Sequence, residues 1–135
     1  MKTLYILLLF LIIFHAVALS QDIPEGSICA ECGMKVDPGS RFSALVIDRE
    51  DNRKYFFCDI GDMLYHYRKS PERIKEVNVR DFISGIWIDG RAAYYVRNKE
   101  FKTPMSWQIG AFRNRTEAER FGKIYTFQEA FELIK

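Results

Sequence analysis

The 135-residue sequence has no large surplus of charge of either sign. It contains 20 Lys and Arg residues against 18 Asp and Glu residues, which gives a formal net charge of +2. Charges of both signs are interspersed along the chain, whereas a nucleic-acid-binding surface needs clustered basic residues. The sequence therefore gives no reason to expect nucleic acid as a partner.

The sequence also lacks the residue patterns of common catalytic sites. It has only two histidines, His15 and His66, no phosphate-binding loop and no nucleophile paired with a general base. His15 lies in an apolar N-terminal run. His66 lies off the apolar face of a predicted helix, so we interpret it as a surface residue. These absences favour a binding protein over an enzyme.

One long apolar run is present, at the N-terminus. Leu4 to Leu19 is apolar apart from Tyr5 and His15, and it follows the single positive charge of Lys2. Small residues, Ala18 and Ser20, precede a possible cleavage site after Ser20. Residues 1–20 therefore resemble a secretory signal. An uncleaved membrane tether through residues 4–19 is the alternative, although a spanning helix needs about 20 residues. Either interpretation predicts a periplasmic or other extracytoplasmic protein. No cysteine lies near this cleavage site, so the sequence does not indicate a lipid anchor.

Cysteine is scarce and odd in number: the chain has three, Cys29, Cys32 and Cys58. In an exported protein an odd count leaves at least one thiol free, unless it pairs between molecules. Free thiols tend to be lost in an oxidising compartment, and binding a soft metal is one use that would retain them.

Beyond a short polar tether at residues 21–28, residues 29–135 are the size of one domain. The pattern predicts an α+β fold of two related ββα-type lobes, about 29–78 and 79–135, in one compact domain. The first lobe is expected to contain two strands and then a helix capped by Asp59; the elements of both lobes are expected at residues 41–47, 54–58, 59–69, 82–89, 91–96, 109–113, 116–121, 123–126 and 127–135.

The cysteines follow the layout of a treble-clef metal site. Cys29 and Cys32 have the spacing of a knuckle, and Cys58 lies 26 residues after Cys32, where a strand meets a helix N-terminus. The helix dipole favours a thiolate there. No fourth cysteine follows Cys58, so a closed four-thiolate zinc site is incomplete.

Two methionines suggest a different metal. Met34 follows Cys32 by two residues, and in an extended segment both side chains would point to one side. Met105 lies in a polar loop, between Pro104 and Ser106. Thioethers bind Cu(I) but barely bind Zn(II), so a site that recruits methionine favours copper. Ordinary packing accounts equally well for these methionines from their spacing alone.

Five motifs together resemble the NosL family, the accessory proteins of nitrous oxide reductase. They are Cys32-Gly-Met34, Tyr55-Phe-Phe-Cys-Asp59, Ile86 to Val96, the loop around Pro104-Met105, and Glu117 to Gly122. The resemblance implies an exported Cu(I)-binding metallochaperone, with nitrous oxide reductase or a similar copper enzyme as its client.

Carried over by position, the resemblance assigns copper binding first to Cys32 and Met105, and then to Met34. Cys29 and Cys58 are not general features of the family, so they are either added ligands or a disulfide pair. The loop around Met105 departs from the family pattern, since it reads Thr-Pro-Met-Ser where a more glycine-rich loop is usual.

Two other functions fit part of the pattern. One is a structural Zn(II) module for protein interaction, with Cys29, Cys32, Cys58 and either His66 or Asp62 as ligands. The other is a thiol–disulfide oxidoreductase that uses Cys29 and Cys32, although the long helix that usually follows such a pair is missing.

Overall fold

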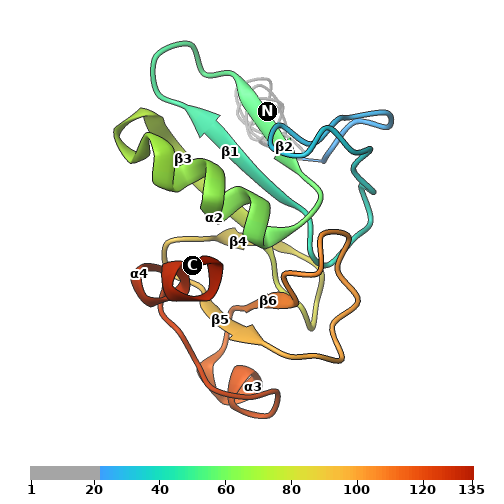
Figure 1. Ribbon diagram of the computed structural model, residues 1–135, viewed down its shortest axis with the longest axis vertical. Helices are drawn as coiled ribbons and strands as arrows, with labels where there is room; N and C mark the ends of the chain where they lie inside the picture. Colours follow the sequence, from blue (N-terminus) through green and yellow to red (C-terminus); the bar gives the residue numbers. More distant parts are fainter. Residues whose placement is uncertain (1–21) are drawn as a thin grey trace, which may run out of the picture.

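The computed structural model describes residues 22–135, which form two antiparallel sheets and the helices that cover them (Figure 1). The larger sheet has the strand order β2-β1-β3-β4, and the smaller sheet pairs β5 with β6. The elements are β1 (Ala44–Asp48), β2 (Lys54–Phe57), α2 (Ile60–Lys69), β3 (Ile74–Arg80), β4 (Trp87–Asp89), β5 (Tyr94–Arg97), β6 (Ile109–Phe112), α3 (Arg115–Glu119), α4 (Phe127–Ala130), and two 3-10 helices at Pro71–Arg73 and Phe131–Ile134. The predicted α+β fold class is confirmed.

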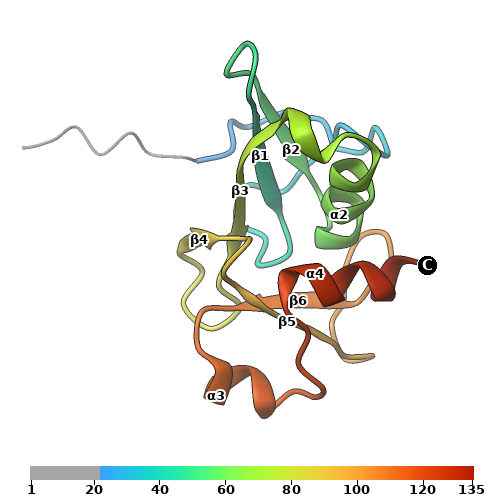
Figure 2. The same ribbon diagram turned by 90° about the vertical axis from the view of Figure 1, so that its left-hand side faces the viewer.

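Helix α2 packs on one face of the larger sheet (Figure 2). Its residues Ile60, Met63 and Leu64 are fully buried in the same core as Val46 of β1 and Val79 of β3. Asp59 caps the helix, because its side chain accepts a hydrogen bond from the Gly61 backbone N–H. The helix predicted over residues 59–69 is therefore confirmed together with its cap.

The smaller sheet lies below the larger one in Figure 1, and helix α4 lies between it and α2. A second apolar cluster packs on the smaller sheet. Its phenylalanines are Phe42, Phe82, Phe101, Phe112 and Phe121. The order strand, strand, helix occurs twice, as β1-β2-α2 and as β5-β6-α3. Strands β3 and β4 come between these two units in the chain.

Strand β3 was not predicted, and it changes how the halves are joined. Its sequence alternates apolar and polar residues only from Val77 onward, and charged Lys75 and Glu76 obscure the pattern. The boundary expected between residues 78 and 79 falls inside this strand. Strand β4, placed in the expected second lobe, pairs with β3 and completes the larger sheet.

Other predicted elements are shorter than expected. The strand predicted over residues 82–89 is reduced to Trp87–Asp89, because Asp81 organises a turn ahead of it. The strand predicted at 123–126 is a single bridge between Tyr95 and Tyr125. The terminal helix changes from α to 3-10 geometry after Ala130.

Asp81 joins the two sheets at the end of β3. Its buried carboxylate accepts hydrogen bonds from the Ser84 backbone N–H and hydroxyl, and from the Arg113 backbone N–H beyond β6. Burial acts to raise the pKa of this carboxyl, but the hydrogen bonds outweigh it and the pKa of Asp81 is lowered.

The predicted signal or tether, residues 1–20, lies outside the described residues. Within residues 22–135, none of the helices has the length and apolar character needed to cross a membrane.

Candidate metal centre

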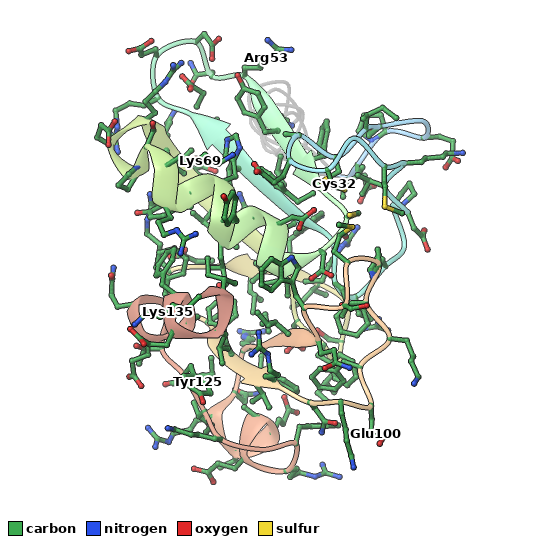
Figure 3. The ribbon with its side chains drawn as sticks, in the orientation of Figure 1. Cys32, Arg53, Lys69, Glu100, Tyr125 and Lys135 are labelled. Carbon is green, nitrogen blue, oxygen red and sulfur yellow. The ribbon has the colours of Figure 1, made fainter. Side chains whose placement is uncertain are left out.

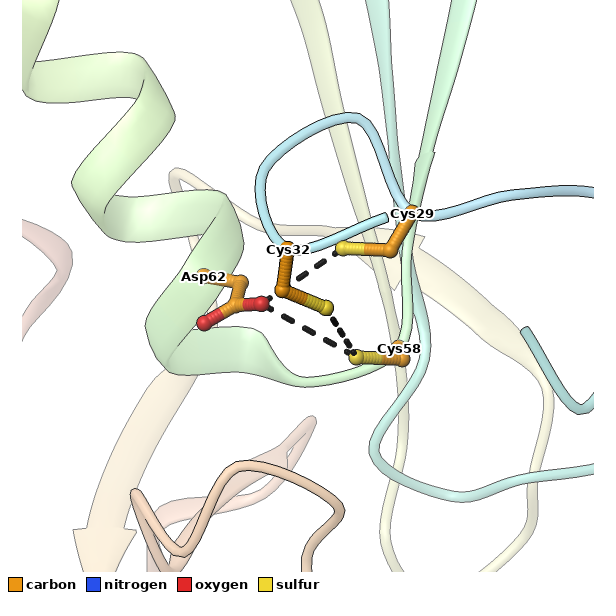
Figure 4. Close-up of side chains that lie close together, drawn as sticks. All are labelled: Cys29, Cys32, Cys58 and Asp62. Atoms are coloured by element: carbon orange, nitrogen blue, oxygen red, sulfur yellow. Dashed lines mark hydrogen bonds between the residues drawn. The ribbon is translucent and has the colours of Figure 1, made fainter. Parts of the chain in front are cut away.

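Three thiols and one carboxylate meet where the N-terminal segment approaches the first turn of α2 (Figure 4). The side chains are those of Cys29, Cys32, Cys58 and Asp62, and their donor atoms all lie within 4.8 Å of one another. The Sγ atoms of Cys32 and Cys58 are 3.4 Å apart. Oδ2 of Asp62 lies 3.5 Å from the sulfur of Cys29 and 3.8 Å from the sulfur of Cys58.

A tight turn brings Cys29 and Cys32 to the same point. The backbone N–H of Cys29 donates to the Met34 carbonyl, and the N–H of Gly33 donates to the Cys29 carbonyl. Gly33 has φ of 76°, a conformation that glycine adopts without strain. The Ala30 N–H donates a hydrogen bond to the Phe56 carbonyl, which joins this knuckle to β2.

The same turn corrects one expectation. Residues 32–34 were expected to be extended, so that Cys32 and Met34 would point to one side. The left-handed Gly33 makes this segment a turn, and the extended-strand argument for the pair is wrong.

Strand β2 and helix α2 supply the other half of the cluster. Cys58 directly follows β2 and precedes the extended cap residue Asp59, and Asp62 lies in the first turn of α2, where its Oδ2 is 3.8 Å from the Cys58 sulfur. In Figure 3, Cys32 lies close to this end of α2. The knuckle, hairpin and helix order of a treble clef is therefore present.

The cluster has the dimensions of a metal site. The three cysteines are free thiols, and the 3.4 Å contact between Cys32 and Cys58 is far longer than a disulfide bond of about 2.05 Å. Two sulfurs at about 2.3 Å from a tetrahedral zinc ion lie about 3.8 Å apart, close to the separations found here. Three thiols and a carboxylate can therefore hold a soft or borderline metal ion without large rearrangement.

Burial controls both access to the sulfurs and their protonation. Cys29 and Cys58 are each only 2% exposed, while Cys32 is partly open to solvent. Burial, and then the contact with Cys32, raises the pKa of the Cys58 thiol. Burial also raises the pKa of Cys32, and the hydrogen bond from the Met34 backbone N–H offsets this only in part. A metal ion that binds here would displace protons from these thiols, and Cys32 is the most exposed of the three.

A loop from the smaller sheet covers the first turn of α2. The indole Nε1–H of Trp107 donates to Oδ1 of Asp62 at 2.8 Å. The backbone N–H of Met105 donates to Oδ2 of Asp59 at 3.0 Å. The Trp107 ring lies directly over Gly61, since a Cβ added at Gly61 would come within 2.0 Å of the ring.

The two methionines approach the cluster through their main chains. Met34 forms hydrogen bonds within the knuckle, and Met105 is bound to the residue after Cys58. Their side chains are 47% and 40% exposed, respectively, which is unusual for large apolar residues.

His66 does not join the cluster. Its Nδ1 lies 3.5 Å from the Glu31 carboxylate, and its ring contacts Tyr55 and Phe57. Burial lowers the pKa of His66, against the opposing effect of Glu31. Of the two candidates for a fourth ligand in the zinc interpretation, the structure therefore brings Asp62 to the thiols and leaves His66 outside.

Sequence reasoning missed Trp107 and named Asp62 only as one zinc ligand among alternatives. The usable signal for the carboxylate was its position in the first turn of the helix predicted to start directly after Cys58. No comparable signal exists for Trp107, because its contact with Asp62 spans 45 residues of the chain.

Comparisons with known proteins agree with this geometry. A model of the NosL family matches residues 20–130. Among solved structures, the chain is similar to the crystal structure of the copper chaperone NosL from Shewanella denitrificans, with 25% sequence identity and a TM-score of 0.69 over 82% of this chain and 93% of that one. No curated protein matches the chain significantly. Because the family match extends over most of its length, the chain belongs to the NosL family.

Proposed function

We propose that this protein is an exported copper chaperone that binds Cu(I) at the sulfur cluster and passes it to a client protein. The observation that carries the proposal is the meeting of three thiols, two of them buried and one partly open, in a member of the NosL family. The similarity to a NosL protein described as a copper chaperone supports the choice of metal. Thiolates are soft ligands and suit Cu(I).

The arrangement supports transfer as well as binding. Cu(I) held by Cys29, Cys32 and Cys58 would be reached from outside through Cys32, the least buried of the three. We propose that the exposed thioethers of Met34 and Met105 act as further ligands, which take over part of the coordination as the ion enters or leaves. An incomplete shell on the exposed side leaves room for a ligand from the client.

The family and the N-terminal sequence support a proposal for the client and for the compartment. We propose a copper enzyme of the nitrous oxide reductase type as client, which the NosL family membership supports. The apolar segment Leu4 to Leu19 supports export, either by a cleaved signal or with the segment kept as a tether.

An anaerobic titration of the purified protein with Cu(I), against a competing chelator, tests the proposal. Cys32→Ser and Met105→Ala are titrated beside the unchanged protein. We expect tight binding that both substitutions weaken, with the larger loss for Cys32→Ser. If neither change weakens binding, the proposed site is wrong.

A structural zinc site is the second candidate, and one observation favours it. Asp62 occupies the fourth position of the cluster, and a carboxylate oxygen is a common zinc ligand but a poor ligand for Cu(I). Under this alternative, removal of Zn(II) by a chelator unfolds the domain, and Met105→Ala changes nothing. Under the copper proposal the metal-free domain remains folded.

A third alternative, thiol–disulfide exchange by Cys29 and Cys32, has less support. The sulfur of Cys32 contacts that of Cys58 at 3.4 Å, and the Cys29–Cys32 segment forms a knuckle rather than the start of a long helix.

A further inference from the structure

Asp62 is held in an unusual position for a carboxylate. It is only 4% exposed, and each of its oxygens faces a different group. Oδ1 accepts the indole N–H of Trp107, while Oδ2 faces the sulfurs of Cys29 and Cys58. In the region that the structure describes, no lysine or arginine forms a recorded ion pair with it.

We propose that the Asp62–Trp107 pair sets the selectivity of the centre between Zn(II) and Cu(I). This inference rests on the proposed function, because it assumes that the thiol cluster is the copper site. With Asp62 in place, the cluster offers three sulfurs and one hard oxygen, a set that completes the tetrahedral shell of zinc. Cu(I) gains little from the oxygen, since it is satisfied by two or three soft ligands.

Trp107 is the positioning residue of the pair. A carboxylate at a helix start has rotational freedom, and the 2.8 Å hydrogen bond from Nε1 fixes which oxygen faces the sulfurs. Residues of this kind, one step behind the ligand, orient it and tune the affinity for the metal. The indole fits because Gly61 leaves it room.

This arrangement makes the smaller sheet part of the site. The loop that carries Trp107 leads into β6, whereas the four cluster residues come from the N-terminal knuckle, the end of β2 and the first turn of α2. A change in the position of this loop would move the Asp62 oxygen relative to the thiols. The loop therefore controls the zinc affinity of a centre whose sulfurs it does not supply.

The test compares Zn(II) and Cu(I) affinities, measured by chelator competition, in the unchanged protein and in two variants. Asp62→Asn removes the charged oxygen, and Trp107→Phe keeps an aromatic ring over Gly61 but removes the N–H donor. We expect Trp107→Phe to weaken Zn(II) binding by about 10- to 100-fold, the range found for groups behind metal ligands, and Asp62→Asn, which removes the ligand itself, to weaken it at least as much. The affinity for Cu(I) should not fall. Trp87→Phe, on β4 and outside the cluster, is the matched control and should leave both affinities unchanged.

A spectroscopic readout separates positioning from general stability. The chain has only two tryptophans, so Trp87→Phe leaves Trp107 as the sole indole. In that background, Zn(II) should change the emission of Trp107, and adding Asp62→Asn should abolish the change. Unchanged zinc affinity in both variants, or equal loss of both metals, overturns the inference. Failure of the unchanged protein to bind Cu(I) overturns instead the proposed function.

Discussion

The backbone N–H of Met105 donates a hydrogen bond to Oδ2 of Asp59, across 46 residues of sequence. Asp59 directly follows Cys58, and its other oxygen caps helix α2. One buried carboxylate therefore both starts the helix beside the thiols and holds the loop that carries Met105.

Asp59→Asn tests this double role. An asparagine has one carbonyl oxygen, so it can cap Gly61 but cannot also accept the Met105 N–H. We expect a stability loss below that of Asp59→Ala, which removes both bonds and should cost roughly 1–3 kcal/mol in urea unfolding. The loop would be released in both variants, and Cu(I) affinity should fall toward that of Met105→Ala. Equal Cu(I) affinity in Asp59→Asn and the unchanged protein would separate the loop from copper binding.

Met105→Ala and Met34→Ala each remove an exposed thioether from a residue whose main chain lies beside the cluster. We expect each to weaken Cu(I) binding by about tenfold, or about 1.4 kcal/mol, and to leave Zn(II) affinity unchanged because thioethers barely bind zinc. Both side chains are well exposed, so the melting temperature should not change. Ile83→Ala, another exposed apolar residue, is the matched control. Loss of zinc binding in either methionine variant would contradict the prediction.

Gly61→Ala tests the contact between the helix and Trp107. The new Cβ would lie 2.0 Å from Cγ of the indole, so the ring must move away from the helix. We expect a cost of about 1–3 kcal/mol from overpacking, reduced by the better helix propensity of alanine. Gly39→Ala is the control, since its Cβ would meet only the Asp37 carboxylate at 3.6 Å. Thermal unfolding monitored by circular dichroism measures both, and equal melting temperatures would refute the contact.

Asp81 makes the stability of the fold depend on pH. Burial opposes its ionisation, but the bonds from Ser84 and Arg113 lower its pKa in the folded protein below the ordinary 3.8. Its contribution to stability is therefore complete above the unfolded pKa, and is lost as the pH falls through the folded pKa. Urea unfolding between pH 7 and pH 3 should show this loss in the unchanged protein. Asp81→Asn should be less stable at pH 7 and should show a weaker dependence below pH 4. Parallel curves for the two proteins would contradict the assignment.

Several elements could be predicted because their signals are local. The apolar spacing in α2 and the Asp59 cap predict the helix, and the two short apolar runs predict β1 and β2. These elements and the spacing of the cysteines together predict that the knuckle meets Cys58.

The rest depends on tertiary contacts that local patterns do not encode. Strand β3 is recognisable only once Ile74, Val77 and Val79 are seen in the same buried core as α2, because the residues between them are polar or charged. The spacing of Cys32 and Met34 suggested an extended segment, but the left-handed conformation of Gly33 makes the chain turn there. The hydrogen bond between Trp107 and Asp62 forms only when the smaller sheet packs against α2. No pattern within either segment therefore predicts it.

We propose that copper is bound by sulfur at the cluster of Cys29, Cys32 and Cys58. X-ray absorption spectra of the Cu(I)-loaded protein, recorded for the unchanged protein and for Cys32→Ser, identify the ligand atoms. We expect a first shell made of sulfur only in the unchanged protein, and a loss of sulfur from that shell in Cys32→Ser. A shell dominated by nitrogen or oxygen, or one that Cys32→Ser leaves unchanged, would contradict it.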